Sequence, residues 1–269
     1  MQRYASLKHL TAEKFHEMRK LNFIAIIIAL ALTSCKKDDT ICYGNTTMGN
    51  ISGANIISDQ GNIFNIVNGN IDLSKFEYGR VMLMCDVLKQ TGENQYDINL
   101  IGISSVLTKE TVKASGIQDE ESEYNVDNAI NIRELWCSGG YINMLLELLV
   151  KNGSDTKHLI NLIYDDTAED GKYSLTLRHN AFGEVPTDDD MDYTPSWGYA
   201  SFPIADIISG DSAEISFRWK SHKYENGQFS MTESTDIEKT FNWNKEGFLH
   251  ENLIPTTPSP TLYMNFLAR

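Results

Sequence analysis

The sequence is poor in basic residues. Its 269 residues include 23 Lys and Arg against 37 Asp and Glu, which gives a formal net charge of −14. Nucleic acids and anionic lipid headgroups attract proteins through basic groups, and an acidic surface repels both. The composition therefore argues against nucleic-acid binding and against docking on an anionic membrane through a basic patch.

Cysteine is also scarce. Of the four cysteines, Cys35 lies next to an apolar segment considered below, and Cys42, Cys85 and Cys137 remain. Three thiols allow at most one internal disulfide, and their scattered spacing fits no metal-binding motif. Cys85 falls on the apolar face of an expected strand, so we expect it to be a buried free thiol. Disulfides are not expected to hold this fold together.

Motifs of covalent and phosphate chemistry are missing as well. The sequence has no Gly-x-Ser-x-Gly nucleophile elbow, no cysteine with a convincing histidine partner and no Gly-rich phosphate loop. Pairs of carboxylates are too frequent in so acidic a chain to indicate an active site. We therefore predict a protein that is not an enzyme and uses no cofactor. A hydrolase would require a concave pocket with convergent polar groups.

The N-terminal segment has the layout of a secretory signal peptide. Arg19 and Lys20 precede a twelve-residue run, Leu21 to Leu32, that is apolar except for Asn22. As a helix this run would be roughly 18 Å long, well short of the ~30 Å hydrocarbon core of a bilayer. We expect residues 1–34 to be removed, and Met18 rather than Met1 to be the true start.

The run ends in Leu32-Thr33-Ser34-Cys35, which resembles the bacterial lipobox. In that motif the cysteine is acylated with fatty acids such as palmitate and becomes the first residue of the mature chain. The resemblance implies that Cys35 anchors the protein to a membrane, since two or more acyl chains give durable attachment. The alternative is an ordinary signal peptide with an incidental cysteine beside it.

The residues after Cys35 bear on where the anchor would lie. Removing residues 1–34 takes away five basic and two acidic residues. The mature chain then has 18 Lys and Arg and 35 Asp and Glu, a net charge of −17. Lys36, Lys37, Asp38 and Asp39 resemble the signal that exports lipoproteins of Bacteroidota to the outer face of the outer membrane. A hydrophilic tether that lifts the folded part off the headgroups is the equally weighted alternative.

The rest of the chain has the sequence pattern of β strands separated by turns. Residues 35–53 are polar and are interpreted as a lipidated tether. Short apolar runs then alternate with turn signals, and the runs 80–88 and 95–103 would form a hairpin that pairs Val87 with Tyr96, Cys85 with Ile98 and Leu83 with Leu100. An acidic segment within 114–128 is interpreted as a linker, with a loop inside one domain as its alternative.

The second half continues the pattern with strand candidates at 130–136, 140–150, 157–164 and 172–180. They suggest a meander in which Tyr164 pairs with Tyr173, Leu162 with Leu175, Ile160 with Leu177 and His158 with His179. Residues 141–150 could be a helix by composition, but the flanking Gly and Asn-Gly residues favour a buried strand. A further strand at 214–220 turns back at Asn226-Gly227. The sequence therefore predicts an all-β protein.

Several short motifs occur in a fixed order along the chain. They are Asp59-Gln60-Gly61, Gly79-Arg80-Val81, Leu107-Thr108-Lys109, Ile132-Arg133-Glu134-Leu135-Trp136, Ser138-Gly139-Gly140-Tyr141-Ile142-Asn143, His158-Leu159-Ile160-Asn161-Leu162 and Leu177-Arg178-His179-Asn180. Together they resemble one family, the NigD-like lipoproteins of Bacteroidota. The resemblance implies an N-terminal OB-like barrel, placed at residues 54–123, and a C-terminal antiparallel β-sandwich at 124–269. It brings no catalytic residues.

Two metal sites can be considered. His158 and His179, as neighbours across two strands, could place two imidazoles near one ion, but zinc requires three or four ligands and paired histidines at the end of a core are the simpler interpretation. The acidic run 188–192 could bind calcium through oxygen ligands, yet it lacks the spacing of a calcium loop. We therefore predict no metal site.

Aromatic residues suggest a second kind of site. Most tryptophans of a sandwich lie in its core, and Trp219 shares the inward parity of Phe217. Trp197, beside Pro195 and Gly198 in a segment that reads as a polar loop, is the candidate for a surface position where a sugar ring could stack.

These observations lead to a functional prediction with alternatives. We predict a non-catalytic, membrane-anchored lipoprotein of the cell envelope, on the outer membrane and facing outward, that binds a protein or glycan partner. One alternative is a glycan-binding accessory lipoprotein that uses Trp197. The other is a bacteriocin-immunity protein, which the family name alone suggests.

Overall fold

The computed structural model describes residues 42–117, 122–165, 171–225, 228–245 and 249–252. Strands dominate these residues, and the helical elements among them are two single 3-10 turns, Leu73–Lys75 and Ala114–Gly116. None of the described helices is long and apolar enough to cross a bilayer. The predicted all-β fold class is confirmed, whereas the predicted signal peptide and Cys35 lie outside the described residues.

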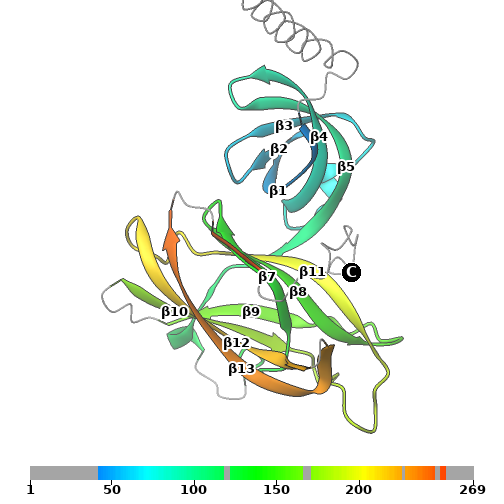
Figure 1. The fold of residues 1–269 in the computed structure, drawn as a ribbon, viewed down its shortest axis with the longest axis vertical. Helices are drawn as coiled ribbons and strands as arrows, with labels where there is room; N and C mark the ends of the chain where they lie inside the picture. Colours follow the sequence, from blue (N-terminus) through cyan, green and yellow to red (C-terminus); the bar gives the residue numbers. More distant parts are fainter. Residues whose placement is uncertain (1–41, 118–121, 166–170, 226–227, 246–248, 253–269) are drawn as a thin grey trace, which may run out of the picture. The chain divides into compact units, whose positions relative to one another are not determined.

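The first five strands close into a barrel. β1 pairs with β2 and β4, β2 pairs with β3, and β5 joins β3 in parallel and β4 in antiparallel fashion. This closed ring confirms the predicted OB-like barrel, and Figure 1 shows the five strands together. The strands are β1 (Cys42–Ser52), β2 (Asn55–Ser58), β3 (Ile63–Asn68), β4 (Arg80–Gly92) and β5 (Gln95–Thr108).

Apolar side chains of alternate residues fill the barrel. Ile56, Leu83, Cys85 and Ile98 are completely buried there. Cys85 is a free thiol, as predicted, and burial raises its pKa to about 11. Neither of the other two cysteines in the described residues, Cys42 and Cys137, forms a disulfide.

Strand β1 lies in the segment that the sequence analysis interpreted as a tether. Residues 42–52 are polar, yet they pair with a strand on each side. Ladder hydrogen bonds join backbone groups, so a polar segment can form a strand when both neighbours are present. Gly49 is required here, because a Cβ atom at this position would lie 2.5 Å from the carbonyl oxygen of Ile57.

The predicted pairing of β4 with β5 is wrong by two to three residues. Leu83 faces Ile103, Cys85 faces Leu100, and Val87 faces Ile98. The connection contains only Glu93 and Asn94, and three irregularities in the ladder take up extra residues. Asn94 adopts a left-handed φ of 54°, a conformation that Asn tolerates in tight turns. The strands and their buried faces were predictable, but the bulges were not.

The remaining strands form the two layers of the predicted β-sandwich. In the first layer the strand order is β14-β7-β8-β11, and β11 also pairs in parallel with the end of β5. In the second layer the strand order is β13-β12-β10-β9-β6. The first layer contains β7 (Asn131–Ser138), β8 (Tyr141–Lys151), β11 (Tyr193–Pro203) and β14 (Leu249–Asn252). The second contains β6 (Val112–Lys113), β9 (Leu159–Tyr164), β10 (Lys172–Asn180), β12 (Ser212–Glu225) and β13 (Gln228–Asn244).

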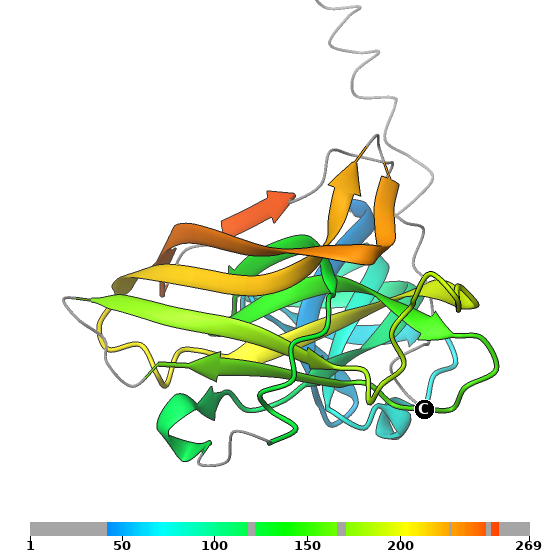
Figure 2. The ribbon, with the colours of Figure 1, turned by 90° about the horizontal axis from the view of Figure 1, so that it is seen from below.

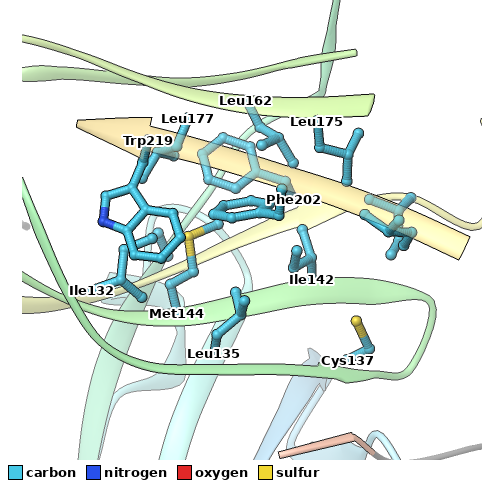
Figure 3. Packing of buried hydrophobic residues seen from close by; sticks show 14 of the residues in the cluster. Ile132, Leu135, Cys137, Ile142, Met144, Leu162, Leu175, Leu177, Phe202 and Trp219 are labelled. Atoms are coloured by element: carbon cyan, nitrogen blue, oxygen red, sulfur yellow. The ribbon is translucent and has the colours of Figure 1, made fainter. Parts of the chain in front are cut away.

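The core lies between these two layers. Figure 3 shows Ile142 and Met144 of β8 and Phe202 of β11 directed toward Leu162, Leu175 and Trp219 of the second layer. Trp219 and Phe217 are buried together, as their shared parity predicted. Residues 141–151 form a buried strand rather than a helix, which confirms the preferred interpretation.

Two predictions about strand pairing in the sandwich are wrong. β8 pairs with β7 and β11 rather than with β9, so the strands do not form one meander. In the β9–β10 hairpin, Tyr164 faces Leu175 and Ile160 faces His179, a shift of two residues from the predicted register. A shift of two preserves which side chains face the core, because the side-chain period of a strand is two.

Candidate functional site

Three of the motifs that resemble the NigD-like family meet at one buried ion pair. Arg80, the first residue of β4, donates from Nη1 to Asp59 Oδ1 at 2.8 Å and from Nη2 to Asp59 Oδ2 at 2.7 Å. The Arg80 side chain is 1% exposed and that of Asp59 is 3% exposed. The guanidinium also lies 4.1 Å from the ring centroid of Tyr141.

Sandwich residues complete this network, which we call the junction cluster: Asp59, Arg80, Ser138, Tyr141, Asn143 and Ser201. Ser138 Oγ donates to Asp59 at 2.5 Å, and Arg80 donates to Ser201 Oγ and to Asn143 Oδ1, both at 3.0 Å. The cluster ties β4 and the β2–β3 turn to β7, β8 and β11. Every member except Tyr141 forms a hydrogen bond within the cluster, and Tyr141 packs against the guanidinium. Because the ion pair at its centre is almost fully buried, we assign the cluster a structural role.

Other motifs of the family resemblance make partly buried contacts. Lys109 Nζ donates to Asn161 Oδ1 at 2.6 Å and to the Ile160 carbonyl at 3.1 Å. Arg178 pairs with Asp127 at 2.5 Å. These contacts join segments that are distant in sequence.

The structure brings His158 and His179 together, even though the predicted register was wrong. His158 Nδ1 and His179 Nε2 are 2.9 Å apart, and His179 Nδ1 lies 3.0 Å from the Ala129 carbonyl oxygen. A carbonyl can only accept, so Nδ1 of His179 carries its proton and Nε2 accepts from His158. Burial lowers the pKa of both rings, that of His179 to about 4.

The histidine pair is therefore a hydrogen-bonded unit inside the fold. Two rings that bond to each other direct those nitrogens at one another rather than at an ion. Within the described residues, no group of three or more His, Cys, Asp or Glu side chains is arranged to hold a metal ion. In the acidic run 188–192, Asp190 pairs with Lys151 at 2.8 Å and Asp192 accepts from Asn152 at 2.7 Å.

Trp197 lies on a strand, and not in the polar loop where the sequence placed it. It belongs to β11 and is half-buried, and it lines a groove of about 490 Å³. The groove contains four aromatic residues, together with polar residues from β7, β8, β12 and β13. The lining residues are Asn131, Arg133, Glu147, Leu149, Tyr193, Pro195, Trp197, His222, Tyr224, Gln228, Phe229, Ser230 and Met231.

An arginine lies at the centre of this groove. Arg133 Cζ is 4.7 Å from the ring centroid of Trp197 and 4.7 Å from that of Phe229. Its guanidinium also pairs with the carboxylate of Glu147, which faces Trp197 across the β8–β11 ladder. The Arg133 side chain is 16% exposed and that of Glu147 is 7% exposed.

The tip of the β12–β13 hairpin forms the other wall of the groove. The ladder between these strands is irregular between His222 and Tyr224, and Figure 2 shows the end of the hairpin, in yellow and orange, bending away from its sheet. Tyr224 and Phe229 pair across the tip with ring centroids 4.8 Å apart. His222 donates its backbone N–H to Asn131 Oδ1 at 3.1 Å, which attaches the hairpin to β7.

Sequence reasoning selected Trp197 but missed Arg133, Glu147 and Phe229. One usable signal was the single acid, Glu147, inside the apolar run 144–149, since a buried charge requires a partner. The partner itself could not be identified, because Arg133 and Phe229 come from strands far apart in sequence. The resulting arrangement can stack against a ligand and form hydrogen bonds with it.

Comparisons with known proteins agree with this architecture. Residues 111–233 match the family model of the NigD-like C-terminal beta sandwich domain. Three solved structures have similar folds, each with a TM-score just above 0.5 and sequence identity below 20%. They are a protein of unknown function from Bacteroides vulgatus, a NigD-like immunity protein from Bacteroides caccae and a protein from Bacteroides fragilis provisionally named a lipoprotein.

These similarities extend over most of each chain. The match to the B. vulgatus protein has a TM-score of 0.52 and 16% identity, and covers 75% of this chain and 90% of that one. The match to the B. caccae protein has a TM-score of 0.51 and 18% identity, and covers 76% of this chain and 97% of that one. The match to the B. fragilis protein has a TM-score of 0.51 and 14% identity, and covers 76% of this chain and 98% of that one.

Identities this low establish similarity of fold alone. No curated protein matches this chain in sequence. The family resemblance therefore rests on the match to the family model, which covers most of the sandwich strands. Residues 111–233 match the NigD-like C-terminal beta sandwich domain, and the family resemblance that the sequence motifs predict is confirmed by this match.

Proposed function

We propose that this protein is a non-catalytic, lipid-anchored binding protein of the cell envelope. Acyl chains on Cys35 would attach it to the outer membrane, facing outward, and the groove around Trp197 would bind its partner. The observation that carries the binding role is the groove itself, in which partly exposed aromatic rings lie beside hydrogen-bonding groups. Its volume of about 490 Å³ is within the usual range for ligand sites.

The anchoring part of the proposal has separate support. The lipobox-like Leu32-Thr33-Ser34-Cys35 follows an apolar run of signal-peptide length. The B. fragilis protein of similar fold is provisionally named a lipoprotein. Attachment through acyl chains also suits an acidic protein, because it does not depend on attraction to anionic headgroups.

Metabolic labelling tests the anchor. Cells grown with labelled palmitate should yield a labelled, membrane-bound protein, and Cys35→Ser should abolish the label. Cys42→Ser is the matched control, because Cys42 is an exposed thiol only seven residues further along the chain and its loss should leave the label intact. Recovery of an unlabelled, freely secreted wild-type protein would refute the anchor. Protease digestion of intact cells then distinguishes the outward-facing protein, which is cleaved, from one that faces inward.

The binding role is tested by capture from intact cells. The anchored wild-type protein and its Trp197→Ala variant would be crosslinked and recovered in parallel, with cell material and growth substrates present. We expect a partner that the wild type retains and the variant loses. Identical captured material from the two proteins would remove the groove from the proposal.

A second candidate is an immunity-type function, which the fold shared with the NigD-like immunity protein from B. caccae favours. It predicts that the protein protects its own cell from a toxin. Deletion of the gene should then raise sensitivity to the cognate toxin, and re-expression should restore protection. Unchanged sensitivity would exclude this candidate and leave the binding proposal unaffected.

A further inference from the structure

The charges in the groove restrict what can bind there. Arg133 and Glu147 are the charged residues among those that line it, and they pair with each other. Burial lowers the pKa of His222, so this ring is neutral at pH 7. A ligand with its own charge would therefore have to break the Arg133–Glu147 pair or remain desolvated without a partner, and both are unfavourable.

Arg133 further disfavours the binding of cationic ligands in the groove. Aromatic rings that surround a pocket attract cationic ligands through their negative faces. In this groove Arg133 already occupies that position, 4.7 Å from the ring centroids of both Trp197 and Phe229. A cationic ligand would compete with the guanidinium and be repelled by it. Anions are also disfavoured, since Glu147 neutralises the groove's one arginine and the whole chain carries a net charge of −14.

The remaining lining requires a ligand with both apolar and polar surfaces. Trp197, Tyr224 and Phe229 present partly exposed aromatic surface. Beside them lie the exposed Gln228, whose amide both donates and accepts hydrogen bonds, and the hydroxyl of Ser230. A purely apolar ligand would bury these polar groups without partners, which is unfavourable.

From these constraints we infer that the groove binds a neutral saccharide, with one pyranose ring packed against the part of the Trp197 ring that Arg133 leaves exposed. A pyranose carries C–H bonds on its faces, which suit the negative face of an indole, and hydroxyl groups on its edge, which suit Gln228, Ser230 and the carboxylate of Glu147. The inference rests on the proposed binding role of the groove and specifies its ligand class. Arg133 acts as a positioning residue that holds Trp197 and Phe229 on the two walls.

The experiment uses the detergent-solubilised mature protein. It would be screened against arrays of neutral oligosaccharides, oligosaccharides of uronic acids, and proline-rich peptides, which also dock in aromatic grooves. Hits would be titrated by calorimetry. We expect binding to a neutral oligosaccharide, and at least tenfold weaker binding to its uronic-acid counterpart.

Substitutions locate the site. Trp197→Ala should weaken binding at least tenfold, equivalent to about 1.4 kcal/mol, while Trp197→Phe should retain most of the affinity. Gln228 is exposed, so Gln228→Ala should leave the stability of the fold unchanged and weaken binding severalfold. Phe182→Ala is the matched control, because Phe182 is an exposed aromatic residue that does not line the groove, and its removal should leave affinity unchanged.

The other outcomes separate this inference from the proposed function. If a peptide or an acidic sugar binds and Trp197→Ala abolishes that binding, the saccharide inference is wrong and the binding role of the groove stands. Saccharide binding that persists in both Trp197→Ala and Gln228→Ala would place the sugar elsewhere and overturn the inference. If none of the three arrays yields a ligand at millimolar concentrations, the neutral-saccharide inference fails.

Discussion

Two arginines in this protein have the same chemical partners but different surroundings. Arg80 lies between the carboxylate of Asp59 and the ring of Tyr141, and Arg133 lies between the carboxylate of Glu147 and the rings of Trp197 and Phe229. The first is 1% exposed and bonds to five other side chains, while the second is 16% exposed and lines a groove.

The difference shows how one arrangement can serve two purposes. A buried ion pair contributes little net stability but makes the position of its elements specific, because any other arrangement leaves a charge unpaired. The junction cluster therefore holds the barrel strands against the sandwich strands. The groove pair is close enough to water that its polar and aromatic groups can exchange solvent for a ligand.

The largest effect is expected at the junction cluster. Asp59→Asn removes the charge that Arg80 requires, and leaving a buried arginine unpaired should lower the free energy of unfolding by about 3–5 kcal/mol. Urea unfolding measures this loss. The double variant Asp59→Asn with Arg80→Met should lose less than the single one, because it leaves no unpaired charge in the interior.

A surface pair supplies the control. Glu214→Gln removes a carboxylate that pairs with Lys172 at 3.2 Å on the exposed side of β12. Such pairs contribute about 0–1 kcal/mol. A loss in Asp59→Asn as small as that in Glu214→Gln would contradict the specific role assigned to the junction cluster.

A buried histidine is expected to make folding sensitive to acid. Burial lowers the pKa of His179 from 6.5 to about 4, so the native state takes up its proton later than the unfolded state does. The stabilising contribution of the neutral ring is complete above pH 6.5 and is lost as the pH falls toward 4. The total loss is about 3 kcal/mol, at 1.36 kcal/mol per pKa unit.

Equilibrium unfolding between pH 4 and 7 tests this prediction. His179→Gln can still donate to Ala129 and accept from His158, but it does not titrate, so its stability should depend less on pH. His222→Gln leaves His179 in place and should keep most of the wild-type dependence. If His179→Gln and the wild type lost stability in parallel, His179 would not be the acid-sensitive group.

A glycine beside the junction cluster allows the cluster to be disturbed sterically, without a change of charge. Gly139 has a φ of 58°, and a Cβ atom at this position would lie 2.6 Å from Asp59 Oδ1, inside the junction cluster. Gly139→Ala should therefore lower the free energy of unfolding by about 2 kcal/mol or more, since it adds displacement of a buried carboxylate to the strain of a left-handed alanine.

The matched substitution is Gly153→Ala. Gly153 has a φ of 78°, and nothing lies within 4 Å of its Cβ position, so only the backbone strain of about 1–2 kcal/mol applies. Denaturant unfolding of the two variants isolates the cost of disturbing the cluster. Equal losses would show that Asp59 can move aside freely.

The strands were predictable because their side chains alternate with a period of two. That pattern identified β7, β8, β9, β10 and β12, the buried Cys85 and the buried Trp219, but not β11. Strand pairing was less predictable, since bulges and the two-residue turn at Glu93 and Asn94 leave no clear mark on the pattern. β1 was missed because its strand character depends on its neighbours and not on apolar side chains.

The candidate site was predictable only in part. His158 and His179 were expected to be neighbours, and they are, because a register shift of two keeps both rings on the same face. Trp197 was selected, but its strand and its partners were not. Asp59, Arg80 and Arg133 all lay in recognised motifs, yet their contacts join residues 14 to 121 positions apart, which no local pattern encodes.

The smallest effect is expected at the groove, where Glu147→Gln is the isosteric counterpart of Asp59→Asn. Arg133 would lose its charged partner but keep both aromatic contacts and its access to water, so the free energy of unfolding should fall by about 1 kcal/mol. Urea unfolding of both variants under one set of conditions gives the comparison directly. If Glu147→Gln lost as much as Asp59→Asn, solvent access would not distinguish the two arginines. The groove would then be as much a structural joint as the junction cluster, and less suited to exchanging its contacts for those of a ligand.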